Sequence, residues 1–325
     1  MGKIRVGVVG VGYLGQFHAE KYANMEGVEL VGVVDIDPPR AKEIAKRCRT
    51  QPFFHHSNLF DKVQAVSIAV PTLVHHPITK DFFLRGIDVL LEKPISQTLG
   101  EADELIGLAE SKGLIFQVGH LERFNGALSS TEGIVQSPLY IESHRLSSFP
   151  GRGTDVNVVL DLMIHDIDIL LSLVNSKVRE IHAVGIPILT SHSDIANARI
   201  EFENGCKANL TVSRVSKEKT RRTRIFLQNG TLSIDYLTQK ASFAKRADHP
   251  RENKIPEIIT EEIPVTKVDS LEAEIHSFLQ SVRDRKRARV SGWDGKRALE
   301  VALQIIQKID EGRIREANPV RNGRV

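Results

Sequence analysis

The first 120 residues alternate short β-branched runs with helix-like stretches, and this rhythm constrains the fold more than any other feature of the chain. The strand-like runs are IRVGVVG, VELVGVVD, AVSIAVP, DVLLEKP and LIFQVG. Runs that are apolar on both faces and separated by helices are typical of a parallel sheet covered on both sides. Connections between parallel strands are right-handed. We therefore predict an α/β, doubly wound Rossmann domain at residues 1–120.

The pattern changes after residue 120, where strand-like segments follow one another with few helices between them. These segments are 138–148, 178–189, 195–203, 206–215, 221–228 and 231–236, and helices are expected at about 157–174, 270–286 and 294–311. Asn-Gly pairs at 204–205 and 229–230 predict hairpin turns. We expect residues 121–325 to form an α+β domain with a large open mixed or antiparallel sheet, for substrate binding and oligomerisation. The helix at 294–311 should pack back toward the first domain.

Charge and apolar content limit the partners of the chain. The 44 Lys and Arg residues against 41 Asp and Glu leave a net charge of +3, too balanced for a dedicated nucleic-acid or membrane-surface binder. The chain has no long apolar run and no signal sequence at its start, and Cys48 and Cys206 match neither a disulfide framework nor a zinc spacing. We expect a cytoplasmic protein whose partner is a small molecule, with no nucleic acid and no membrane.

A glycine-rich loop, GVGYLG, begins at Gly10, directly after a strand and before a helix. In such loops the first glycine allows a tight turn, the second lets a pyrophosphate approach the backbone, and the third permits close packing of helix on strand. Asp35 ends the second strand about 20 residues later, where an acid binds ribose hydroxyls. An acid there repels a 2′-phosphate, so we predict NAD rather than NADP. Arg40 lies close enough in sequence to weaken that preference.

Two further segments carry groups suited to chemistry. Glu92-Lys93-Pro94 ends the fourth strand-like run, at the carboxyl edge where doubly wound sheets bind ligands. Proline excludes Lys93 from helical conformation, and a Lys-Pro bond can be cis. Either a plain turn or a lysine aimed at the ligand fits this pattern.

The segment VVLDLMIHDIDILLSLV reads as a buried helix. Its polar residues fall in one stripe at Asp161, His165, Asp168 and Ser172. A buried Asp and His without partners cost several kcal/mol, so the stripe must face polar groups, a ligand or water. A self-satisfied Asp-His pair and a catalytic pair explain it equally well.

Together these motifs resemble the glucose-fructose oxidoreductase and inositol dehydrogenase (Gfo/Idh/MocA) family. The resemblance rests on GVGYLG, Asp35, AVPTLVHHPI, EKP, VGHLERFN and the helix with Asp161 and His165, in the family's order, and on the closing GWDGKRALEVALQII. It implies an N-terminal NAD(P) domain and a C-terminal domain whose sheet mediates dimers or tetramers. It also implies that Lys93, Asp161 and His165 line the sugar site as catalytic residues. The expected cofactor-binding residues are Gly10, Gly12, Tyr13, Leu14, Gly15, Asp35, Pro71, Thr72, His75, Glu92 and Lys93.

One departure from the family is the stretch RGTDVNVV at 152–159, where many relatives carry glycines. This segment and HLERFN resemble the corresponding segments of a subgroup of the family. That subgroup oxidises UDP-N-acetylglucosamine at C3 in the biosynthesis of lipid A, and hence of lipopolysaccharide. We expect Arg123, Arg152 and Asn157 to bind the substrate, the arginines through charge-assisted bonds to a diphosphate. An aminotransferase would then consume the keto sugar.

Oxidation of a secondary alcohol needs a base for the hydroxyl proton and a donor for the developing oxyanion. His165 can be the base, because an imidazole has an ordinary pKa of about 6.5. Lys93 would stabilise the oxygen and Asp161 would orient the histidine or bind a neighbouring hydroxyl. The reverse assignment of Lys93 and His165 remains open.

Two rival functions are an inositol or free-sugar dehydrogenase of the same family and a non-catalytic NAD-binding sensor. A sensor is expected to have lost part of the Lys-Asp-His set, which is intact here. The histidine pairs at 55–56 and 75–76 lack metal-site spacing and carboxylate company, so we predict no metal.

Overall fold

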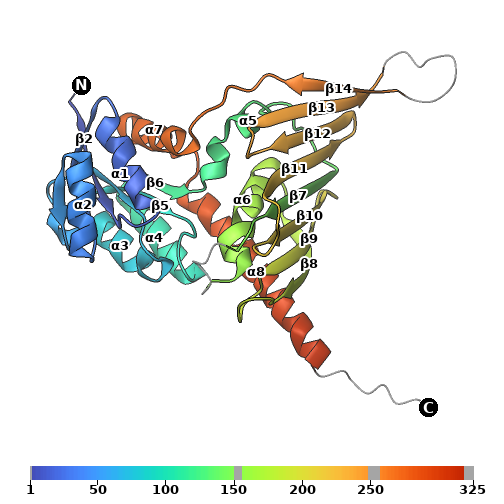
Figure 1. Ribbon diagram of the computed structural model, residues 1–325, viewed down its shortest axis with the longest axis horizontal. Helices are drawn as coiled ribbons and strands as arrows, with labels where there is room; N and C mark the ends of the chain where they lie inside the picture. The colour runs from blue at the N-terminus through green and yellow to red at the C-terminus, as the bar shows by residue number, and fades with distance from the viewer. Residues whose placement is uncertain (1, 150–155, 248–256, 318–325) are drawn as a thin grey trace. The chain divides into compact units, whose positions relative to one another are not determined.

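The computed structural model describes residues 2–149, 156–247 and 257–317, and the chain divides into two units. The first comprises Met1–Leu121 together with Asp269–Leu299, and the second comprises Glu122–Val268 and Glu300–Val325. The division expected from the sequence assigned 269–299 to the second domain. Figure 1 labels the elements of both units.

The first unit contains a six-stranded sheet whose neighbouring strands all run parallel. Its strands are β1 (Ile4–Val9), β2 (Val28–Val34), β3 (Gln51–Phe53), β4 (Ala65–Ile68), β5 (Asp88–Glu92) and β6 (Phe116–Gly119). The order is β3-β2-β1-β4-β5-β6, so the chain reverses direction across the sheet between β1 and β4. Ligands of doubly wound sheets bind outside the carboxyl ends of the strands at this switch point.

Helices cover both faces of this sheet (Figure 1). They are α1 (Gly15–Asn24), α2 (Pro38–Cys48), α3 (His75–Leu84), α4 (Leu99–Ser111) and α7 (Ser270–Asp284), with short turns η1 (His56–Leu59) and η2 (Thr72–Val74). The helix starts follow local chemistry. Asp37 caps α2 ahead of a proline, and Thr98 and Glu101 form a reciprocal capping box on α4.

Helix α7 belongs to the first unit because its apolar face enters the first core. Ile275, Phe278 and Leu279 are buried in one cluster with Ala19 and Tyr22 of α1. The change in secondary-structure pattern at residue 120 does not show that α7 rejoins the first unit. The contacts that place α7 there are long-range, and no local sequence pattern indicates them.

The second unit contains an eight-stranded sheet in the order β14-β13-β12-β11-β7-β10-β9-β8. Its strands are β7 (Tyr140–Leu146), β8 (Val178–Ile186), β9 (Ile195–Phe202), β10 (Lys207–Ser213), β11 (Thr220–Leu227), β12 (Gly230–Asp235), β13 (Lys240–Arg246) and β14 (Ile258–Ile263). Strand β10 pairs with β7 in parallel, and the other neighbouring strands of this sheet pair antiparallel. The sheet is therefore mixed, as the sequence predicts.

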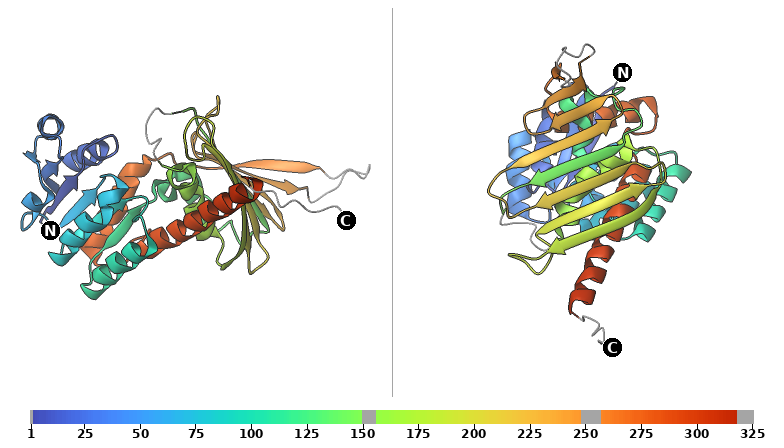
Figure 2. Two further views of the ribbon diagram at one scale, coloured as in Figure 1. Left: turned by 90° about the horizontal axis from the view of Figure 1, so that it is seen from below. Right: turned by 90° about the vertical axis from the view of Figure 1, so that its right-hand side faces the viewer.

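One face of this sheet is packed and the other is open. The helical elements of this unit are η3 (Leu121–Phe124), α5 (Gly126–Ser129), the π-helical turn η4 (Val159–Met163) and α6 (Ile164–Leu173), and α8 (Gly292–Ala317) runs from the first unit into it. Along β9, Ala196, Ala198 and Ile200 are buried, whereas Asn197 and Arg199 are not. This alternation is typical of a sheet with one covered face. The right-hand view of Figure 2 shows the strands side by side.

The predicted fold class is confirmed in both halves, and both Asn-Gly hairpins occur, between β9 and β10 and between β11 and β12. Strands β13 and β14 were not predicted. The edge strand β14 pairs with β13 alone and is almost wholly exposed, so its sequence shows no buried-exposed alternation. No helix within the described residues combines the length and the apolar composition needed to cross a lipid bilayer.

Candidate active site

The three glycines of the loop between β1 and α1 have different structural surroundings. Gly10 has a φ of +81°, and a Cβ there would lie 2.5 Å from the carbonyl oxygen of Ala69. A Cβ on Gly15 would lie 1.8 Å from the carbonyl oxygen of Gly10, so the start of α1 touches the turn. A Cβ on Gly12 would meet no atom within 4 Å. The loop therefore packs tightly at both ends and leaves space open at its middle glycine.

The acid at the end of β2 holds this loop. Asp35 is 7% exposed; its Oδ2 accepts a hydrogen bond from the Val11 N–H at 3.0 Å, and its Oδ1 accepts one from the Asp37 N–H at 3.0 Å. Arg40 lies 3.7 Å from Asp35 and 3.2 Å from Asp37. A carboxylate has about four acceptor positions, so Asp35 can still accept a ribose hydroxyl. The predicted influence of Arg40 on this acid has a geometric basis in these contacts.

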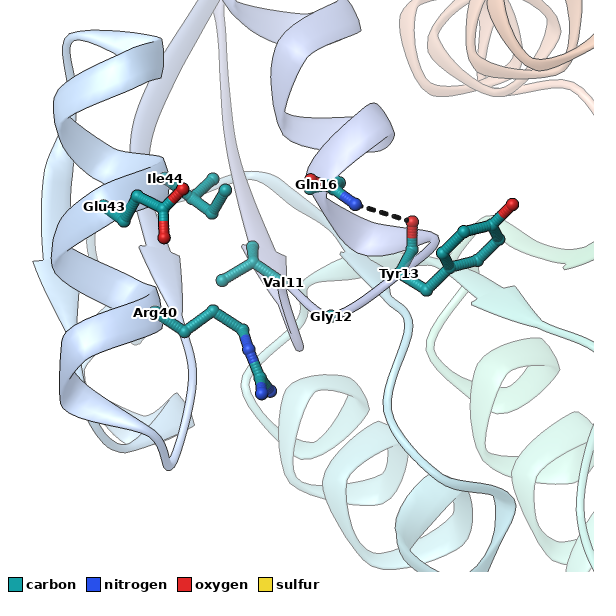
Figure 3. A pocket seen from close by; sticks show the side chains of 7 residues that line it. All are labelled: Val11, Gly12, Tyr13, Gln16, Arg40, Glu43 and Ile44. Carbon is teal, nitrogen blue, oxygen red and sulfur yellow. Dashed lines mark hydrogen bonds between the residues drawn. The ribbon is translucent and has the colours of Figure 1, made fainter. Parts of the chain in front are cut away.

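A cavity of about 320 Å³ lies beside the loop. Its lining, shown in Figure 3, is Val11, Gly12, Tyr13, Gln16, Arg40, Glu43 and Ile44. No side chain caps the start of α1. Helix N-termini with uncapped N–H groups are suited to phosphates. The open space at Gly12, the acid and the helix start therefore fit the pyrophosphate and adenosine ribose of a dinucleotide.

The Glu92-Lys93-Pro94 turn follows β5, and its Lys-Pro peptide is cis. The Nε2 of His18 in α1 lies 3.1 Å from Oε1 of Glu92. Burial alone would raise the pKa of the Glu92 carboxyl, but the hydrogen bond from His18 and the nearby Lys93 and His75 hold this pKa below its usual value. Glu92 is therefore ionised at neutral pH. Lys93 itself is half-buried.

His75, at the start of α3, reaches the other side of the same turn. Its Nδ1 lies 2.8 Å from the carbonyl oxygen of Pro94, and its Nε2 lies 2.9 Å from that of Val70. Burial lowers the pKa of this imidazole, against the opposing effect of the two carbonyl contacts. Its predicted place beside the cofactor stays a prediction, and its contacts support the loops around Lys93.

One buried cluster has the ligand types of a metal site. Ligand atoms of His18, Glu92 and Glu274, the last from α7, all lie within 4.8 Å of one another. The hydrogen bond between His18 and Glu92 explains why two of these three side chains lie close together. The prediction of no metal, made from histidine pairs elsewhere in the chain, stays a prediction.

In the second unit, Asp161 lies in the π-helical turn and His165 lies one residue inside α6. Both side chains are half-buried. Single π-helical turns within helices occur frequently at functional sites. The rest of the predicted stripe differs in its surroundings. Asp168 is 2% exposed and lies 3.3 Å from Arg123, and the exposed Ser172 donates its hydroxyl to the carbonyl of Ile169.

A buried ion pair joins Asp166 of α6 to Arg145 of strand β7. Arg145 of β7 donates to both carboxylate oxygens of Asp166, at 2.9 and 3.0 Å, and to Glu122 at 2.9 Å. Burial alone would lower the pKa of Arg145, but Asp166 and Glu122 raise it above its usual value. The residue directly after His165 is thus held by a bidentate ion pair.

The remaining predicted residues have varied positions. Asn157 accepts a hydrogen bond from the Val159 N–H at 3.0 Å, just before the π-helical turn. Leu14 precedes α1, and Pro71 and Thr72 form the start of η2 after β4. Arg152 lies outside the described residues. Lys93 belongs to the first unit, and Asp161 and His165 belong to the second.

Sequence reasoning gave no role to four buried polar residues: His18, Glu274, Arg145 and Asp166, although Asp166 directly follows His165 in the motif of the helix. Each makes its contact to a residue distant along the chain, such as the 74-residue separation of His18 and Glu92. The available signal was an ionisable residue in an otherwise apolar helix or strand, which indicates burial with a partner but does not name the partner.

These features define an NAD-binding oxidoreductase class: a doubly wound domain with a dinucleotide loop, followed by a domain with an open mixed sheet. Residues 4–120 match a family described as an oxidoreductase family with an NAD-binding Rossmann fold, and residues 138–233 match the GFO/IDH/MocA C-terminal domain. The chain belongs to the Gfo/Idh/MocA family.

Among its relatives is UDP-N-acetylglucosamine 3-dehydrogenase from Acidithiobacillus ferrooxidans, 37% identical over 303 residues that span 93% of this chain and 96% of that protein. The solved structure of that enzyme, GnnA, superposes with a TM-score of 0.91 at 36% identity, covering 96% of this chain and 99% of the other. An inositol 2-dehydrogenase from Rubrobacter xylanophilus is 30% identical over 194 residues, 57% of this chain and 56% of that protein.

Proposed function

We propose that this protein oxidises the C3 hydroxyl of UDP-N-acetylglucosamine to a 3-keto sugar with NAD. The observation that carries the proposal is the 37% identity to UDP-N-acetylglucosamine 3-dehydrogenase over nearly the whole of both chains. The similarity includes the second unit, where substrate specificity of a two-domain dehydrogenase is expected to reside. Bound NAD would accept the hydride from the sugar carbon.

The roles of the three candidate catalytic residues follow from their chemistry. His165 removes the hydroxyl proton as the carbonyl forms. Lys93 donates a hydrogen bond to the same oxygen and stabilises its developing charge. Asp161, four residues before His165, orients the imidazole or binds a neighbouring sugar hydroxyl. The half-buried state of all three side chains supports roles in contact with substrate.

A diphosphate would be bound by Arg123 and Arg152, with Asn157 near the sugar. Arg123 contacts Asp168 through one of its nitrogens at 3.3 Å. A guanidinium has five N–H donors, so this contact leaves donors for a phosphate. A free sugar or an inositol has no group that needs these cations.

The second candidate function is an inositol or free-sugar dehydrogenase. It is favoured by the inositol 2-dehydrogenases among the relatives, such as the one from Rubrobacter xylanophilus. Those relatives are less similar or cover a smaller part of the chain than the UDP-N-acetylglucosamine enzyme. A non-catalytic NAD sensor is the third candidate, and the intact Lys93, Asp161 and His165 oppose it.

The proposed setting is a cytoplasmic homodimer or homotetramer that feeds an aminotransferase. The open face of the eight-stranded sheet supports assembly through that face. Oxidation of an alcohol by NAD is unfavourable near neutral pH, so a reaction that consumes the ketone is needed. Transamination to a 3-amino sugar is such a reaction.

The test incubates the protein with UDP-N-acetylglucosamine, NAD, glutamate and a sugar aminotransferase. We expect the 3-amino sugar in the mass spectrum, and its absence when NAD or the protein is omitted. A parallel assay offers myo-inositol and free hexoses with NAD. Strong NADH formation there, with no amino sugar in the first assay, would assign the protein to the second candidate function.

A further inference from the structure

The turn that carries Lys93 is contacted on both sides by buried histidines from two helices, α1 and α3. His18 approaches the residue before the lysine and His75 approaches the residue after it. Each histidine is 1% exposed. We call Glu92, Lys93 and Pro94 with these two histidines the lysine clamp, and all five residues lie in the first unit.

The first half of the clamp joins the lysine turn to the helix of the dinucleotide loop. His18 lies one turn inside α1, which begins at Gly15, and its Nε2 contacts the Glu92 carboxylate at 3.1 Å. The carboxylate is also confined from behind, since a Cβ on Gly119 of β6 would lie 3.1 Å from its carboxyl carbon. The carboxyl group of Glu274 faces the same pair, with a ligand atom within 4.8 Å of those of His18 and Glu92. The side chain of Glu92 therefore has little freedom.

The second half joins the lysine turn to the loop after β4. Both ring nitrogens of His75 lie within 2.9 Å of carbonyl oxygens, which only accept hydrogen bonds. A neutral imidazole has one N–H, so His75 donates to at least one of the two carbonyls in either tautomer. The ring thus bridges the backbone of Val70 and that of Pro94.

We propose that His18 and His75 are positioning residues that hold Lys93 in its working orientation. The inference rests on the proposed catalytic role of Lys93. Because His18 is part of α1 and His75 follows the β4 loop, the clamp ties the lysine to two segments expected to contact the dinucleotide. Loss of either histidine should lower the rate of the chemical step, because small displacements of a reacting group are costly. Loss of His18, which is not among the expected cofactor-binding residues, should also leave NAD binding largely intact.

The test compares variants that keep or remove the N–H donor. His18→Met and His75→Leu remove it, whereas His18→Gln and His75→Gln retain an amide N–H. We expect the first pair to lower kcat by about 10-fold or more, and we expect KM for NAD to stay within about twofold of wild type in His18→Met. The glutamine variants should recover much of kcat. His76→Gln is the matched control, because His76 is adjacent in sequence but contacts Glu104 instead.

A second readout does not depend on any substrate. Acetic anhydride labelling followed by peptide mass spectrometry measures the reactivity of Lys93, with exposed Lys62 as the internal standard. We expect severalfold faster acetylation of Lys93 in His18→Met and His75→Leu, and no change in His76→Gln. If the wild type oxidises no sugar, the proposed function fails, and the labelling still decides whether the clamp exists.

The clamp is refuted by either of two results. One is unchanged kcat and unchanged Lys93 labelling in both apolar variants. The other is an equal loss in the glutamine variants, which would show that side-chain volume and not hydrogen bonding matters. If His18→Met does not fold, Gly119→Ala replaces it, since it displaces the Glu92 carboxylate while keeping both histidines. Reduced kcat and faster Lys93 labelling there support the clamp, and wild-type values overturn the His18 half of it.

Discussion

The two units hold their candidate catalytic groups by different means. In the first unit Lys93 lies in a turn at a sheet edge, and its neighbours are held by histidines and backbone carbonyls. In the second unit His165 lies on a helix whose flanking acids, Asp166 and Asp168, are paired with arginines. The turn around Lys93 is held by histidine contacts to its two neighbouring residues, and the helix around His165 is held by buried charge pairs.

This difference indicates where each unit is sensitive. A turn at the carboxyl edge of a parallel sheet contributes little to the core, so disturbing it should change activity more than stability. A helix held by buried ion pairs depends on them, because removing one partner leaves an uncompensated charge away from water. We therefore expect loss of the buried ion pairs around α6 to destabilise the fold. We expect substitutions of the groups that face ligand in the glycine loop and at Lys93 to affect ligand binding and catalysis.

The largest expected effect is that of Arg145→Met. The Arg145 side chain is 3% exposed and pairs with both Asp166 and Glu122. Its loss leaves the buried Asp166 without its cation and removes one of the two arginines that contact Glu122, the other being Arg221. We expect a decrease of about 3 to 5 kcal/mol in the free energy of unfolding. Urea denaturation followed by circular dichroism measures it. Arg222→Met is the control, because Arg222 is 67% exposed in its pair with Asp235, and should cost no more than about 1 kcal/mol. Equal stability of Arg145→Met and wild type would contradict this account.

The next effect concerns catalysis in the same unit. His165→Asn keeps a polar side chain of smaller size on α6, so the melting temperature and the affinity for NAD should stay near wild type. The base is lost, and kcat should decrease by roughly 10² or more. Steady-state NADH formation with UDP-N-acetylglucosamine measures it, beside thermal melting and NAD titration. An unfolded variant, or one with near-normal turnover, would remove His165 from the mechanism.

Most of the fold was predictable because its signals are local. The apolar runs of β1, β2, β4 and β5, the proline and capping residues at helix starts, and the Asn-Gly turns each act within a few residues. The glycine loop was predictable in detail, since positive φ at Gly10 and tight packing at Gly15 are requirements that only glycine meets. The second sheet was predictable as a class, but its strand order was not.

The supports of the candidate site were not predictable, because their signals are not local. The ion pair of Arg145 and Asp166 joins a strand to a helix. The local sequence of neither segment identifies the residue with which it pairs. The π-helical turn at Asp161 departs from the 3.6-residue period on which the polar stripe was predicted, and Asp168 and Ser172 accordingly have different surroundings from His165. Buried polar residues in apolar segments indicate that a partner exists. Only the fold identifies it.

A smaller effect separates two glycines of the first unit. In Gly15→Ala the new Cβ would lie 1.8 Å from the Gly10 carbonyl oxygen, and the strain should cost about 1 to 3 kcal/mol of stability. Gly12→Ala meets no atom within 4 Å, so its melting temperature should be unchanged while its affinity for NAD decreases by about tenfold, about 1.4 kcal/mol. Thermal melts and NAD titrations of both variants measure this. A destabilised Gly12→Ala, or unimpaired NAD binding by it, would show that the middle of the loop does not face the dinucleotide.

The smallest effect is the choice between NAD and NADP. Asp35 faces the Val11 and Asp37 N–H groups and lies near Arg40, so its negative charge is partly offset but still opposes a 2′-phosphate. Asp35→Ala should weaken NAD binding by about tenfold or more and reduce the difference between the affinities for NAD and NADP, since a hydrogen bond to a charged group contributes about 1.5 to 3 kcal/mol and about 1.4 kcal/mol is a factor of ten. In that variant Arg40 would supply the cation for the phosphate, so the double variant Asp35→Ala with Arg40→Ala should lose the gain in NADP affinity. Calorimetric titration of both cofactors against the wild type and the two variants measures the difference between the affinities for NAD and NADP. Tighter binding of NADP than NAD by the wild type would show that Arg40, and not Asp35, dominates the cofactor site.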